Sequence, residues 1–132
     1  MTQEDKELLI KEICARIPYG VKGIIEGGDV ITTPLKWYAE QALELSIKYM
    51  VVKNGWRPYL FPMSSMTEKQ KEEYHYIVNY ISPDDTENWV EGEFVYVNQI
   101  EQLLHFYHTN HLDYRGLIPE GLAIDATGLN IY

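Results

Sequence analysis

The sequence predicts an α+β fold, a single compact domain over residues 1–132 in which three to four amphipathic helices pack on a small, mainly antiparallel sheet. Two observations predict this class. Apolar residues recur at helical spacing in several segments, and β-branched residues flank a Glu-Gly-Gly-Asp turn. The chain is 45% hydrophobic and 23% charged, a composition that favours one folded core and argues against disorder.

A first helix is predicted over residues 2–17. Thr2 and Asp5 have the spacing of a capping box, in which two side chains at the helix start bond to backbone N–H groups. The apolar residues share one face, as the helical period requires; they are Leu9, Ile10, Ile13, Cys14 and Ile17. Pro18 disfavours helical backbone at the preceding residue, which predicts the end of the helix there.

A β-hairpin is predicted next, with strands at about 20–26 and 29–33. Gly27 and Gly28 can both adopt the positive φ that a tight turn demands. A phosphate-binding loop is the alternative reading of paired glycines. The segment lacks the Lys-Ser/Thr ending and the immediately following helix of that motif, so the hairpin is favoured.

A second helix is predicted over 34–52. Thr33 and Pro34 have the character of an N-cap followed by a first helical residue, and Gly55 supplies the stop. Two prolines within 56–66 remove backbone donors and fix backbone angles, so this stretch is expected to run extended and irregular.

The remaining elements follow from similar signals. A capping box begins a helix over 67–81, a strand is expected over 89–98 with its strongest signal at 94–97, and a last helix is expected from 98 to about 110. Several glycines and a proline make 111–132 an irregular C-terminal segment. Its apolar residues predict that it packs on the body of the domain, with one short strand around 121–125.

The charge balance excludes some classes of partner. Twenty acidic and 11 basic residues give a net charge of −9, and the basic residues are scattered. Nucleic acid is therefore not an expected partner, because backbone binding needs clustered Lys and Arg. The acidic N-terminus has no secretory signal character and no apolar run could span a membrane. The lone Cys14 excludes an internal disulfide, and the cytoplasm is the expected compartment.

Residues 105–116 concentrate the residue types that carry chemistry. His105, His108 and His111 with Asp113 could hold a metal ion or supply an acid or base. On a continuous helix, however, successive members of the histidine trio are rotated by about 60° and do not converge. Hydrogen-bonded or exposed histidines at a helix end are the favoured interpretation. No cofactor is predicted.

Five residues are candidates for binding. Arg115 could hold an anion, but a pairing with Asp113 or with the last helix carbonyls is favoured. The others are large aromatic residues, which dominate the binding energy of protein interfaces; they are Trp37, Trp56, Tyr59 and Trp89. Core or rim positions are the favoured alternative for these aromatic residues.

Two segments resemble a known group of sequences. The stretches PYLFPMSSMTEKQKEEY and DYRGLIPEGLAIDATGLNIY are similar to segments of small proteins encoded by phages, prophages and mobile elements of gut anaerobes. The resemblance implies a phage-associated setting within a bacterial host. It supplies no catalytic or binding residues to carry over.

Three functions remain open from the sequence. A non-enzymatic accessory protein that acts by protein binding or self-association is favoured, because the residues show no catalytic signature. A metal-dependent or acid/base enzyme would centre on His105, His108, His111 and Asp113. A small-ligand-binding module would use a pocket lined by some of the 11 tyrosines. The oligomeric state is left open.

Overall fold

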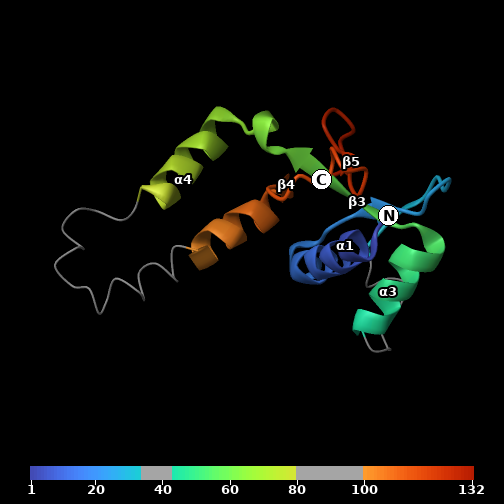
Figure 1. Ribbon diagram of the computed structural model, residues 1–132. Helices are drawn as coiled ribbons and strands as arrows, with labels where there is room; N and C mark the ends of the chain where they lie inside the picture. The colour runs from blue at the N-terminus through green and yellow to red at the C-terminus, as the bar shows by residue number, and fades with distance from the viewer. Residues whose placement is uncertain (34–42, 80–99) are drawn as a thin grey trace, which may run out of the picture.

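A computed structural model describes residues 1–33, 43–79 and 100–132, and of residues 43–47 it describes the backbone alone. The predicted α+β class is confirmed. The helices are α1 (Gln3–Arg16), α3 (Leu43–Asn54), α4 (Glu68–Val78) and a helical segment over 100–109. The short 3-10 turn η1 (Ile17–Tyr19) follows α1, and η2 (Met63–Ser65) lies between β3 and α4. Figure 1 shows α1 beside α3, and α4 beside the helix over 100–109, with the strands between the two pairs. Among the described residues no helix is both long enough and apolar enough to cross a membrane.

The small sheet is mixed. Its strands are β1 (Gly23–Ile24), β2 (Ile31–Thr32), β3 (Arg57–Pro62), β4 (Leu112–Asp113) and β5 (Ile124–Asp125). Their order is β2-β1-β3-β4, and β5 pairs with β3 outside this path. The β1–β2 and β1–β3 pairs are antiparallel, whereas β3 is parallel to both β4 and β5. β3 is therefore the strand on which the sheet is assembled.

The expectation that residues 56–66 are irregular is wrong, because β3 occupies most of this stretch. Its two prolines lie close to the two ends of the strand, where a missing N–H is tolerated. The residues between them make the ladder bonds. Tyr59 N donates to Lys22 O over 2.8 Å, Phe61 N donates to His111 O over 2.8 Å, and Ala126 N donates to the Leu60 carbonyl over 2.8 Å.

The capping signals of two helices are confirmed. Thr2 and Asp5 exchange two hydrogen bonds of 3.0 Å at the start of α1. Thr67 and Gln70 do the same at the start of α4, over 2.9 and 3.2 Å. Gly55, at a φ of +63°, follows the end of α3 as predicted. The start of the second helix at Pro34, the strand at 94–97 and the start of the last helix lie outside the described residues.

The hairpin is confirmed, with shorter strands than expected. The turn is closed by Gly28 N donating to Ile25 O over 2.8 Å, and of the two glycines only Gly27 has positive φ, at +75°. In the C-terminal segment β5 lies within the predicted strand at 121–125. β4 was not expected, because a strand of two residues leaves too short a pattern to detect.

Apolar side chains gather in two clusters, one on each side of β3. The first joins α1, α3 and β3 around the fully buried Trp56. The second joins α4 to the helix over 100–109 around Phe106. Gly23 lies so close to the Trp56 ring and to the Arg57 carbonyl that any Cβ atom there would collide with both. A glycine is therefore required where β1 passes the indole.

Val51 and Val52 on α3 offer a matched test of the first cluster, since their side chains are 1% and 40% exposed. Val51→Ala is expected to lower the free energy of unfolding by about 1–2 kcal/mol, because two buried carbons lose their contacts. Val52→Ala should change it by less than about 0.5 kcal/mol. Urea unfolding followed by tryptophan fluorescence measures both. Equal effects of the two variants would contradict the placement of α3 against α1.

Candidate functional site

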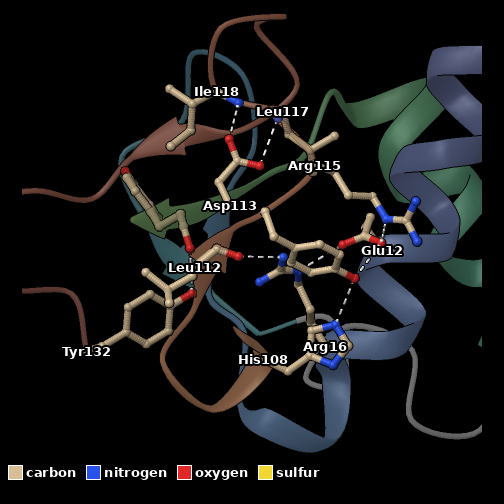
Figure 2. A network of polar contacts seen from close by, with 11 residues as sticks. Glu12, Arg16, His108, Leu112, Asp113, Arg115, Leu117, Ile118 and Tyr132 are labelled. Carbon is tan, nitrogen blue, oxygen red and sulfur yellow. Dashed lines mark hydrogen bonds and ion pairs between the residues drawn. The ribbon is translucent and has the colours of Figure 1, made fainter. Parts of the chain in front are cut away.

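One buried carboxylate joins the first helix to the C-terminal segment. Glu12 and Arg16 lie one turn apart on α1 and are only 1% and 0% exposed. Arg16 Nε donates to Glu12 Oε2 over 3.3 Å, and Arg115 Nε donates to Glu12 Oε1 over 2.5 Å. Arg16 Nη2 also donates to the Leu112 carbonyl over 2.8 Å. Figure 2 shows the carboxylate held between the two guanidinium groups.

Tyr114 extends this network. Its hydroxyl donates to Glu12 Oε1 over 3.1 Å and lies 3.2 Å from His108 Nε2. The guanidinium carbons of Arg16 and Arg115 each lie 5.4 Å from the centre of the Tyr114 ring, within the range of a cation–π contact. Burial, and then the Glu12 carboxylate, raise the pKa of Tyr114. Burial, and then the Arg16 guanidinium, lower the pKa of His108, which favours a neutral imidazole.

Asp113 closes the turn that follows the last helix. Its two carboxylate oxygens accept hydrogen bonds from Leu117 N and Ile118 N, each over 2.8 Å. Gly116, which lies in the turn between Asp113 and Leu117, has a φ of +74°. The expected pairing of Arg115 with Asp113 or with the helix-end carbonyls is therefore wrong. Backbone amides already occupy the carboxylate of Asp113, and the Arg115 side chain points to α1 instead.

The other two histidines of the trio have other hydrogen-bonding or stacking partners, although the Tyr19 ring lies 5.4 Å from the rings of both His105 and His108. His105 is exposed, and its Nδ1 lies 2.9 Å from the Tyr19 hydroxyl. His111 follows the end of the helix at a φ of +54°, and its ring stacks on Tyr132 with 3.5 Å between the ring centres. Burial, with smaller effects of the Arg16 and Lys22 cations, lowers the pKa of His111 to about 4. Across residues 1–33, 43–79 and 100–132, no group of three His, Cys, Asp or Glu side chains is placed to hold a metal ion.

The candidate interface aromatics that the structure describes lie in the interior. Trp56 is 0% exposed and its indole Nε1 donates to Thr32 Oγ1 over 3.3 Å. Tyr59 is 8% exposed. Both positions agree with the core alternative for these residues. Trp37 and Trp89 lie outside the described residues.

Pattern analysis did not single out Glu12 and Arg16, although the sequence carries a signal for them. They follow Leu9 and Ile13 at helical spacing and so belong to the buried stripe of α1. Two opposite charges one turn apart on such a stripe indicate a buried pair. Both oxygens of Glu12 and both of Asp113 accept bonds from within the chain, so this network is suited to holding segments together.

The opposite side of α1 forms a groove with α3. The groove has a volume of about 740 Å³. Its apolar surface comes from Ile10, Cys14 and Val52, and three lysines and one glutamate surround it; these are Lys6, Lys11, Lys48 and Glu7. We call this the α1–α3 groove. Acidic residues outnumber basic residues by 20 to 11 in the whole chain. The charge around the groove is therefore positive, opposite in sign to the net charge of the chain.

No known protein family, curated protein or solved structure matches the chain.

The buried carboxylate can be tested by an isosteric change. Glu12→Gln is expected to lower the free energy of unfolding by roughly 3–5 kcal/mol, because the fully buried Arg16 guanidinium loses its counter-charge. The control is Glu7→Gln on the exposed part of the same helix, with an expected change under about 0.5 kcal/mol. Chemical unfolding followed by circular dichroism measures both. Similar stabilities of the two variants would show that the Glu12 pairing adds little.

The depressed pKa of His111 predicts a pH dependence. Its ordinary value is 6.5 and its folded value is about 4, so between these the unfolded chain binds more protons. Stability that is fully present above pH 6.5 is therefore lost as the pH falls toward 4. His111→Asn, which tolerates the left-handed backbone at this position, should flatten this dependence in unfolding curves measured at several pH values. If the free energy of unfolding depended on pH in the same way in the variant and the wild type, the dependence could not be attributed to His111.

Proposed function

We propose that this chain is a non-enzymatic accessory protein of a phage or mobile element, which acts in the cytoplasm of a bacterial host by binding a protein partner. The observation that supports the proposal is the α1–α3 groove, an apolar depression surrounded by lysines on an otherwise acidic chain. The resemblance of the C-terminal DYRGLI segment to proteins of mobile elements supports the biological setting.

The groove indicates the chemistry of the partner. Ile10 and Cys14 belong to the apolar stripe of α1, and both are only half-buried. A groove between two helices accommodates the apolar face of a third. Carboxylates beside that face would meet Lys11 and Lys48 on the two sides. The favoured partner is therefore a protein that presents an acidic amphipathic helix.

The net charge of −9 does not prevent this association. At physiological ionic strength charges more than about 8 Å apart are largely screened, so the nearest side chains dominate. In the groove those are three lysines and one glutamate, which leave a net positive charge there. Nucleic acid is not proposed as a partner, because three lysines around an apolar floor do not form the extended cationic track that phosphates require.

The buried network supports an internal, structural role. The carboxylates of Glu12 and Asp113 each accept two or more hydrogen bonds from the chain itself. A general acid or base must reach a proton on a substrate, and these groups already have partners inside the fold. We therefore assign binding to the surface of α1 and α3 and stability to the interior.

A labelled helical peptide with a leucine stripe flanked by glutamates tests the groove. Fluorescence anisotropy should show saturable binding to the wild-type chain that weakens as salt is added. The double variant Lys11→Glu, Lys48→Glu should bind roughly tenfold more weakly, since two attractive charges become repulsive.

The matched control is Lys69→Glu, Lys71→Glu, which makes the same charge change on the exposed surface of α4. This variant should keep the affinity of the wild type. A peptide in which lysines replace the glutamates should bind weakly to all three proteins. Absence of binding by the wild type, or equal losses in the two double variants, would contradict the groove as the binding surface.

A further inference from the structure

The strand β2 ends the sheet in the part of the chain that the structure describes. It pairs with β1, with Thr32 opposite Gly23 and Ile31 opposite Ile24, and no described strand lies on its other side. In Figure 1 the light-blue hairpin loop that leads into β2 projects from the body of the molecule. An edge strand presents backbone N–H and C=O groups that can pair with another chain.

Among the described residues, this edge is protected only by the shortness of its strand. Natural proteins guard exposed edges with lysines, prolines, bulges or very short strands. β2 is short, but the four residues 30–33 are all β-branched and uncharged. Val30 is 66% exposed and Ile31 is 43% exposed. The segment has the composition that favours strand extension, and its apolar side chains remain in water.

A depression of about 370 Å³ lies beside the edge. Ile31, Leu129 and Ile131 contribute its apolar surface, and its polar surface comes from Lys22, Thr32, Thr33 and Asn130. Leu129 is 51% exposed. A strand added to β2 would cover these side chains as well as the backbone edge, so pairing and apolar burial would favour the same arrangement.

We propose that β2 is the pairing edge of a two-fold symmetric homodimer, in which the β2 strands of two copies run antiparallel and the sheet continues across the axis. In the register centred on Ile31, each Val30 lies opposite a Thr32, and each Asp29 lies opposite a Thr33. No charge then meets a like charge, although each copy carries a net charge of −9. The uncharged strand is where two acidic copies can approach each other, and a two-fold contact is self-complementary.

Sedimentation analysis over a range of concentrations tests the dimer. The wild type should form a dimer, and added salt should strengthen it by screening the repulsion between acidic copies. Ile31→Lys should raise the dissociation constant at least about tenfold. Ile100→Lys is the matched control, because Ile100 is 47% exposed on the last helix, and it should leave the dimer unchanged. A wild type that stays monomeric, or a dimer that survives Ile31→Lys, would overturn the proposal.

Disulfide trapping tests the register without relying on a destabilising charge. In a Cys14→Ala background, Ile31→Cys should oxidise rapidly to a covalent dimer, because paired residues on the axis bring their Cα atoms within disulfide range. Asp29→Cys should cross-link far more slowly, because the two copies of this residue are four positions apart in the proposed register. Equal rates, or no cross-link at position 31, would refute the antiparallel pairing. The binding of the acidic peptide to the α1–α3 groove is a separate measurement, so either proposal can fail alone.

Discussion

The Glu12 carboxylate is the constraint on which the arrangement of the chain depends. A buried carboxylate is unfavourable unless charged and hydrogen-bonding groups surround it, and here Arg16, Arg115 and Tyr114 supply them. Two of these groups come from a segment about a hundred residues further along the chain. Through Arg16, the same cluster also holds the carbonyl of Leu112, the first residue of β4. The position of α1 and the position of the parallel strand β4 are therefore fixed by one set of charges.

Local sequence signals predicted the parts of the fold that local interactions form. The Thr2 and Thr67 capping boxes bring together groups three residues apart, so they can be read without knowledge of the rest of the chain. The strand β3 could not be predicted in this way. Its two prolines fit a strand only because the neighbouring strands do not need an N–H group at those positions. Those neighbours come from 23–24, 112–113 and 124–125, and no short window of sequence contains them together.

In the candidate site, too, some features follow from local sequence and others depend on how distant segments pack. His105, His108 and His111 are close in sequence, and the geometry of a helix already indicated that they would diverge. The structure gives them different hydrogen-bonding or stacking partners, namely Tyr19, Tyr114 and Tyr132, although the Tyr19 ring also lies beside His108. The α1–α3 groove was beyond sequence analysis, because it depends on how far α3 covers the apolar stripe of α1. The sequence did show that the apolar stripe is wide, because it includes Ile10 and Cys14 beyond the buried core. That width was the one sign that part of the stripe could form a groove.

The central place of β3 has a consequence for how the protein folds during synthesis. Its antiparallel neighbour β1 is made before it, but its parallel neighbours β4 and β5 are made about 50 to 65 residues later. Ribosomes add about 5–20 residues per second, so β3 waits several seconds with one side of its backbone unpaired. Contacts between distant segments also form slowly, because the intervening chain must first be ordered. In the nascent chain, the backbone groups of Leu60 and Phe61 that later bond to the C-terminal segment are thus unpaired, which exposes β3 to mispairing or to capture by a chaperone until residue 125 has left the ribosome.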